Sequence, residues 1–150
     1  DKTDLKKLIS ECDLLEGGVL IPGAEAPKLV TKEMIKSMKR GSVIVDVAID
    51  QGGCVETSKP TTHANPTFMV DEVVHYCVAN MPGGVPRTST MALNKAILPL
   101  LLKLADHGYK KTLKENKNYL AGLNVYRGEI THKGVSDAFN LKYTPASELF

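Results

Sequence analysis

One run of residues, Ser42 to Ile49 with the sequence SVIVDVAI, constrains the fold of this chain more than any other feature. β-Branched side chains fill most of its positions, which favours a β-strand that is covered on both faces. Strands of this kind are typical of parallel sheets, because helical crossovers then cover both sides of the sheet. The run therefore predicts an α/β fold.

Two further strands are predicted, one on each side of this run. Leu14 to Ile21 is apolar except for Glu16 and its glycines, and it predicts a buried strand that ends in a loop. Tyr76 to Ala79 predicts a third, shorter strand. Strands that alternate with helices imply βαβ crossovers, so we expect a parallel sheet in the first half of the chain.

The helices of the first half are predicted from apolar spacing and capping residues. A short helix is expected over about residues 5–12, with Thr3 or Asp4 as its N-cap. A second is expected over 31–40, where an N-cap, an acidic first turn, a basic last turn and a following glycine all agree. A weaker helical stretch is expected over 68–74.

The sequence changes character near Arg87. Beyond it, Thr88–Thr90 can cap a long helix that stops at Gly108, and Pro99 should bend or break this helix near Lys95. A second helix over about 110–122 and a C-terminal segment with Val135, Ala138 and Phe139 follow, with no strand-like run among them. We therefore divide the chain into a sheet-containing part, 1–87, and a helical part, 88–150.

Composition excludes several classes of function. The 19 basic and 17 acidic residues leave a net charge of +2, which is too small and too dispersed for a nucleic-acid-binding protein. The lysines at 110, 111, 114 and 117 recur at helical spacing and are interpreted as a solvated helix face. No apolar run approaches the roughly 20 residues that a membrane helix needs. We predict neither a nucleic-acid nor a membrane partner.

Cysteine and histidine usage bears on the compartment and on metals. Cys12, Cys54 and Cys77 are odd in number and widely spaced, which favours a reducing cytoplasm over a disulfide framework. They form no CxxC pair, and no histidine pair has metal-binding spacing, so no metal site is predicted. The chain starts at Asp1, and 150 residues are too few for a complete two-domain enzyme, so it reads like a piece of a longer protein.

Candidate chemistry lies just after the predicted strands, because open parallel sheets bind ligands beyond their carboxyl ends. Each of these three loops carries glycine, and together they could form one rim, although ordinary turns explain any one of them. Asp50 could act there as a general base or orient a water, or it could cap a turn. Asp46 is expected to be hydrogen-bonded in the core. Lys59 could meet a phosphate or be solvated.

Two long motifs carry a family resemblance. The runs VLIPGAEAPKLVTKEMIKSMKRGSVIVDVAIDQGG and HYCVANMPGGVPRTSTMALNKA resemble alanine dehydrogenase, the NAD-dependent enzyme that interconverts L-alanine with pyruvate and ammonium. The likeness runs from about Leu14 to Gly108 with its spacing intact. It implies the C-terminal half of a Rossmann-type parallel NAD-binding sheet, residues 1–87, followed by helices, 88–150, that belong to a discontinuous substrate domain.

The resemblance also implies site residues. Asp50 matches the family's catalytic aspartate, which works with a histidine on the water that attacks the iminium. That histidine, the substrate-binding lysine and arginine, and the pyrophosphate-binding glycine turn match nothing in this chain. We expect the isolated chain to be inactive and the parent protein to form a homo-oligomer, a hexamer by resemblance. The cofactor contacts of the family fall on Val19, Leu20, Val47, Ala48, Ile49, Asp50, Lys59, Val78, Ala79, Asn80 and Met81.

Two alternatives and one departure from the family pattern stay open. The NAD(H)-binding component of a proton-translocating transhydrogenase has a similar fold, and a non-catalytic domain could assemble through exposed apolar surface. Glu16 stands where the family is apolar. Because an unpaired carboxylate in a buried strand is costly, the first strand is expected to be exposed, displaced or at an edge of the sheet.

Overall fold

The computed structural model describes residues 2–150, with side chains from Asp4 onward. Contacts between residues divide this part of the chain into two compact units. Unit 1 contains the residues up to Ile21 and Glu25–Gly84, and unit 2 contains Pro22–Ala24 and Val85–Phe150. The main division of the chain thus falls between Gly84 and Val85.

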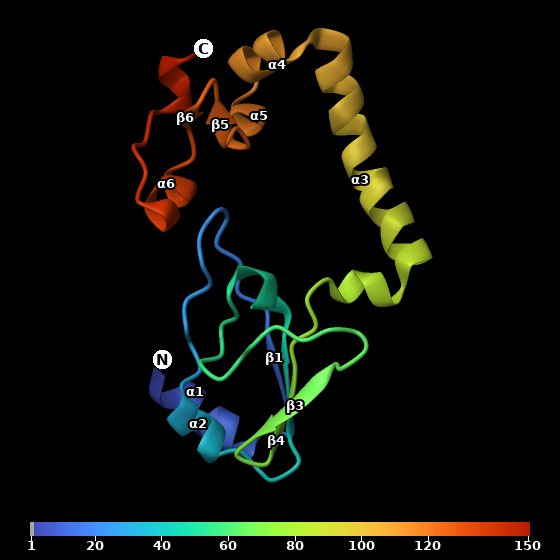
Figure 1. The fold of residues 1–150 in the computed structure, drawn as a ribbon, viewed down its shortest axis with the longest axis vertical. Helices are drawn as coiled ribbons and strands as arrows, with labels where there is room; N and C mark the ends of the chain where they lie inside the picture. The colour runs from blue at the N-terminus through green and yellow to red at the C-terminus, as the bar shows by residue number, and fades with distance from the viewer. Residues whose placement is uncertain (1) are drawn as a thin grey trace. The chain divides into compact units, whose positions relative to one another are not determined.

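Unit 1 is built on a four-stranded sheet in the order β1-β2-β4-β3 (Figure 1). Strands β1, β2 and β4 are parallel, and β3 pairs antiparallel with β4 at the edge. The prediction of an α/β fold with a mostly parallel sheet is confirmed. The strands are β1 (Leu14–Gly17), β2 (Val43–Asp46), β3 (Thr67–Val70) and β4 (Val73–Tyr76).

Two helices, α1 (Lys2–Glu11) and α2 (Lys32–Lys36), cover one face of this sheet. Ile9 of α1 and Ile35 of α2 pack in one buried cluster with Ile44 of β2. On the opposite face, Val43 and Val45 are only half-buried. The expectation that this strand is covered on both faces is therefore wrong for the described chain, whose sheet has one covered face.

All three strands of the parallel sheet end earlier than predicted. β2 stops at Asp46, and residues 47–51 form a short 3-10 helix, η1 (Val47–Gln51). The side chain of Asp46 accepts the backbone N–H of Ala48, which turns the chain out of the sheet. β1 likewise ends at Gly17 instead of Ile21. β4 covers 73–76 and shares only Tyr76 with the strand predicted over 76–79, so that prediction is three residues too far along the chain.

The segment over 68–74 is a β-hairpin, so the predicted helical stretch is wrong. β3 and β4 are joined by Asp71 and Glu72, with φ angles of 49° and 63°. A two-residue turn with positive φ at both positions matches the right-handed twist of the flanking strands. The usual sequence signal of such a turn, Asn-Gly or Asp-Gly, is absent here.

The edge position of β1 resolves the question raised by Glu16. β1 pairs with β2 along one side only, and the Glu16 side chain is exposed. The expectation of an exposed or edge-like strand is confirmed. A carboxylate on this strand therefore stays in water and avoids the desolvation cost of a buried charge.

Helix boundaries differ from the predictions in small ways. α1 begins at Lys2, so Thr3 and Asp4 lie in its first turn and not at the predicted N-cap position. α2 has the predicted N-cap, because the side chain of Thr31 accepts the N–H of Met34 at 3.3 Å. It ends at Lys36, short of the predicted residue 40.

Unit 2 begins with a long helix, α3 (Pro86–His107). Pro86 lies in its first turn and Val85 supplies no side-chain cap, so the predicted capping by Thr88–Thr90 is wrong. Gly108, with φ 75°, ends the helix as predicted. The helix continues through Pro99 without a break, and Figure 1 shows a change of direction in its N-terminal part. None of its residues is buried.

The rest of unit 2 is more broken than predicted. Asn116, with φ −134°, interrupts the expected helix over 110–122 and caps the second of the two resulting helices through its side chain. A small hairpin follows, which contradicts the expectation of no strand in this part. The elements are α4 (Tyr109–Glu115), α5 (Lys117–Ala121), β5 (Val125–Tyr126), β6 (Glu129–Ile130), α6 (Lys133–Phe139) and η3 (Ala146–Glu148).

Over the described residues, no helix combines the length and the apolar character needed to cross a membrane.

Candidate functional site

A pocket of about 470 Å³ opens at the carboxyl edge of the sheet in unit 1. Its two walls come from the loop after β1 and from η1, which follows β2. Because β1 and β2 are parallel neighbours, both loops leave the sheet at the same edge. The pocket is lined by Gly18, Val19, Leu20, Val47, Ala48, Asp50 and Gln51.

The structure thus brings together five of the residues on which the cofactor contacts of the resembling family fall. Val19 and Leu20 face Val47 and Ala48 across this pocket, and Asp50 lies beside them. Gly18 and Gln51 also line it, although sequence reasoning gave neither a role. Gln51 follows Asp50 directly in the motif IDQGG, and this position could have indicated a role at the site.

Asp50 does not directly follow a strand as predicted but lies within η1. Its side chain is exposed, whereas its neighbour Ile49 is buried at 3% exposure. A tight 3-10 turn points successive side chains in different directions, so Ile49 anchors the turn while Asp50 faces solvent. A carboxylate placed in this way can exchange protons with water and can reach a molecule in the pocket.

Asp46 fixes the start of η1 from the core. Its carboxylate is fully buried and accepts backbone N–H groups from Ala48, Cys54 and Val55 at 3.0–3.3 Å. The Ser58 hydroxyl donates to it as well, at 2.6 Å. The expectation that Asp46 is hydrogen-bonded in the core is confirmed. One side chain therefore gathers donors from both ends of the loop that carries Asp50.

Two glycines fix the other end of η1. Gly52 and Gly53 have φ angles of 91° and 79°, and their N–H groups donate to the carbonyls of Ile49 and Ala48. A Cβ on Gly53 would lie 2.8 Å from the carboxylate of Asp46. Only glycine combines this backbone conformation with so close a contact. The Gly-Gly pair of the motif therefore has a structural explanation.

Gln51 connects the two walls of the pocket. Its Nε2 donates to the carbonyl of Ile21, in the loop after β1, at 3.3 Å. Its Oε1 is buried and has no hydrogen-bond partner among the described residues. Because the Ile21 carbonyl can only accept a hydrogen bond, this contact determines which end of the Gln51 side-chain amide points toward it.

The remaining predicted cofactor residues do not line this pocket. Val78 and Ala79 follow β4 and are held beside Thr61, whose carbonyl accepts the N–H of Ala79 at 3.2 Å. Asn80 has φ 55°, and Met81 begins a short 3-10 helix, η2 (Met81–Gly84). Since β4 is parallel to β2, this segment leaves the sheet at the same edge as the pocket.

Lys59 and two histidines are engaged elsewhere. The ammonium of Lys59 lies 4.6 Å from the centre of the Phe68 ring, in a cation–π contact. His63 donates from Nε2 to the carbonyl of Asn80 at 3.0 Å. His75 is buried, with one ring nitrogen 2.7 Å from the Thr57 hydroxyl and the other 3.0 Å from a backbone carbonyl. Burial lowers the pKa of His75, so it is a neutral core residue.

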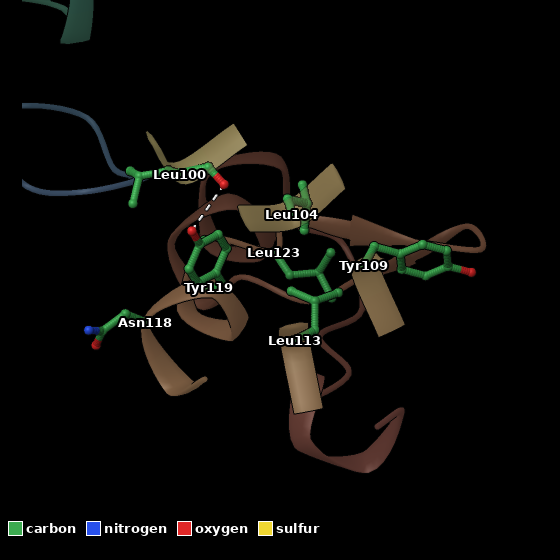
Figure 2. Close-up of a pocket in the computed structure, with 8 residues that line it drawn as sticks. Leu100, Leu104, Tyr109, Leu113, Asn118, Tyr119 and Leu123 are labelled. Atoms are coloured by element: carbon green, nitrogen blue, oxygen red, sulfur yellow. Dashed lines mark hydrogen bonds between the residues drawn. The ribbon is translucent and has the colours of Figure 1, made fainter. Parts of the chain in front are cut away.

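A second pocket of about 470 Å³ lies in unit 2 and is apolar (Figure 2). The side chains of Leu104, Leu113 and Leu123 gather at its centre, and Asn118 points away from them. Tyr119 donates from its hydroxyl to the carbonyl of Leu100 at 3.0 Å. No predicted site residue lines this pocket, and it offers no carboxylate or imidazole for catalysis.

No group of three or more His, Cys, Asp or Glu side chains within the described range is arranged to hold a metal ion. The buried thiols do not supply a nucleophile, because burial raises the pKa of both Cys54 and Cys77. The pocket with Asp50 is therefore the candidate site of unit 1.

Comparison with known proteins gives consistent matches. The family model "Alanine dehydrogenase/PNT, C-terminal domain" matches residues 1–133. Alanine dehydrogenases from Halomonas elongata and Staphylococcus haemolyticus are 59% and 57% identical over 145 and 146 residues, which is 97% of this chain. The chain spans 39% of the length of these curated relatives.

Two solved structures are similar. An L-alanine dehydrogenase matches 93% of this chain with a TM-score of 0.75 and 48% identity, and the match covers 38% of that protein. A transhydrogenase from Sinorhizobium meliloti matches 69% of this chain with a TM-score of 0.62 and 30% identity, over 29% of its own length. The first match is better in coverage, geometry and identity.

Proposed function

Because the chain belongs to the family of C-terminal domains of alanine dehydrogenase and PNT, we propose that it is part of an L-alanine dehydrogenase. The reaction is the oxidative deamination of L-alanine to pyruvate and ammonium, and its reverse. One observation carries the proposal: an exposed aspartate, Asp50, lies at a pocket formed by the two loops that bear the family motifs.

The pocket suits the nicotinamide end of NAD. Val19, Leu20, Val47 and Ala48 give it a mostly apolar lining, and a planar ring buries its faces well against such surfaces. When bound, NAD supplies the hydride acceptor for the substrate carbon. The residues of this chain hold the ring, exclude water from its faces and present one carboxylate beside it. Val78, Ala79, Asn80, Met81, Ile49 and Lys59 complete the proposed contacts with the rest of the cofactor.

Asp50 has the position of a general base. Deamination consumes a water, which becomes more nucleophilic when a carboxylate accepts its proton. An exposed aspartate at the edge of an apolar pocket can hold such a water next to the substrate carbon. Aspartate loses this ability when its charge is removed, so replacement by asparagine tests the role while keeping the shape.

The test uses the longest natural gene product that contains these residues. We expect NADH formation that depends on L-alanine, and a loss of about 10²- to 10⁴-fold in kcat for Asp50→Asn, as for other general bases. Asp71→Asn is the matched control, because Asp71 is an exposed aspartate of the β3–β4 turn. Turnover by Asp50→Asn within threefold of the unmodified enzyme contradicts the assignment.

The nucleotide-binding component of a transhydrogenase is the second candidate, since a transhydrogenase shares the fold of 69% of this chain. The two functions differ in the hydride donor. Activity with alanine and NAD supports the dehydrogenase, whereas hydride exchange between two nucleotides without alanine supports the transhydrogenase. The carboxylate of Asp50 favours the dehydrogenase, because only deamination needs a base for water.

The two units have different proposed roles. Unit 1 is proposed to be part of the NAD-binding domain, and unit 2 part of the substrate domain, with the boundary near residue 87. A cytoplasmic, hexameric parent protein is proposed from cysteine usage and family resemblance. We expect no turnover from residues 1–150 alone, because the pyrophosphate turn and the partner histidine have no match in them. NADH production by this isolated chain contradicts that expectation.

A further inference from the structure

The segment from Ala26 to Val30 lies beside the end of η1 and donates hydrogen bonds to four consecutive carbonyls, those of residues 51–54. The N–H of Ala26 donates to the carbonyl of Gln51, and the N–H groups of Leu29 and Val30 donate to that of Cys54. The two carbonyls between them are not reached by any backbone donor of this segment. Lys28 supplies both bonds from its side chain.

The ammonium of Lys28 lies 2.5 Å from the carbonyl oxygen of Gly52 and 2.8 Å from that of Gly53. In the part of the chain that the structure describes, it forms no ion pair with a carboxylate. A charged donor makes a stronger hydrogen bond than a neutral one, and here it makes two. Both accepting residues are glycines in the left-handed conformation, which hold the chain directly after Asp50 and Gln51.

We propose that Lys28 is a positioning residue for Asp50, which rests on the function proposed above. Glycine backbones are intrinsically mobile, so the direction of η1 depends on what holds Gly52 and Gly53. Asp46 holds the first end of the turn from the core, and Lys28 holds the second end from the surface. Loss of the ammonium leaves the pocket lining in place and lets the aspartate move.

The consequence is selective. Lys28 is exposed, and its neighbours Ala26 and Val30 carry the packing of the segment, so Lys28→Met leaves the core intact. Val19, Leu20, Val47 and Ala48 keep their places, so cofactor affinity should change little. A displacement of Asp50 by about 1 Å can lower the rate by roughly 100-fold, because catalysis requires exact placement.

The experiment uses the longest natural gene product and the variants Lys28→Met, Lys28→Arg and Lys36→Met. We expect Lys28→Met to lower kcat about 10- to 100-fold, with the Kd for NADH within threefold. Lys28→Arg should restore most of the rate, because a guanidinium can also donate to two carbonyls. Lys36→Met is the control, since Lys36 is an exposed lysine that pairs with Glu33 on the surface and contacts neither Gly52 nor Gly53 in the described chain.

Two results overturn the proposal. The first is an unchanged kcat in Lys28→Met. The second is a loss of kcat in Lys28→Met that comes with a loss of NADH affinity and a lower melting temperature, none of which Lys28→Arg restores. If the unmodified protein does not oxidise alanine, the proposed function fails, and hydrogen exchange decides this inference separately. Peptides that contain the amides of Gly52 and Gly53 should then exchange faster in Lys28→Met than in Lys36→Met. Equal exchange in the two variants overturns the proposal.

Discussion

Removal of the Asp46 carboxylate should destabilise unit 1 more than any other single change to a charged residue of the described chain. The carboxylate is inaccessible to solvent and accepts three backbone N–H groups and one hydroxyl. In Asp46→Ala these donors remain in the interior without an acceptor. Each unsatisfied buried donor costs about 1–3 kcal/mol.

The expected loss is smaller than the sum over the four donors. Water can enter the space left by the side chain, and the folded protein no longer has to desolvate a carboxylate. We therefore expect a decrease of about 3–5 kcal/mol in the free energy of unfolding, a large part of the 5–15 kcal/mol typical of a domain. Urea unfolding, followed by circular dichroism, measures it.

The control is Asp13→Ala. Asp13 is also an aspartate of unit 1, but its side chain is 85% exposed and pairs with Lys39 on the surface. Such a pair contributes about 1 kcal/mol at most. A loss below about 1 kcal/mol for Asp46→Ala, or equal losses for both variants, would refute the view that the buried carboxylate organises the loop after β2.

Three further outcomes are expected. Burial lowers the pKa of His75, so the unfolded chain binds a proton more readily than the folded chain. The free energy of unfolding should therefore fall as the pH drops below 6.5, the ordinary pKa of histidine. The urea midpoint of the variant His75→Gln should lack this pH dependence. The double change Asp71→Asn and Glu72→Gly should stabilise the β3–β4 hairpin by about 1 kcal/mol in thermal unfolding, because both positions have positive φ. The isolated 150-residue chain should self-associate in sedimentation experiments, because large apolar side chains of α3, such as Met91 (65% exposed), face solvent; a monomer that is stable on dilution contradicts this.

Elements such as α1, β1, α2 and β2 could be predicted because apolar runs and capping residues act locally. Thr31 caps α2 and Gly108 ends α3, as their residue types favour. The hairpin over 67–76 could not be predicted in this way. Its turn residues, Asp71 and Glu72, adopt positive φ because the pairing of β3 with β4 holds them there, and this pairing is a tertiary effect.

The residues of the candidate site could be predicted, but the backbone structure that carries them could not. The motif identified Asp50 and its neighbours, and the apolar run over 42–49 then placed them at the end of a long strand. That run is interrupted by one polar residue, Asp46, whose hydrogen bonds turn the chain into η1. The spacing of apolar residues cannot reveal these hydrogen bonds, because the donors at Cys54 and Val55 lie eight and nine residues further along the chain.

The same contacts explain why the site depends on polar groups outside the pocket, Asp46 and Lys28, as much as on the residues that line it. Among the described residues, no hydrogen bond orients the side chain of Asp50, so its direction follows from the backbone of η1. That backbone is fixed by a buried anion, Asp46, at its start and by an exposed cation, Lys28, at its end. Because one anchor is buried and the other is exposed, substitution at Asp46 should act mainly on folding, whereas substitution at Lys28 should act mainly on the rate.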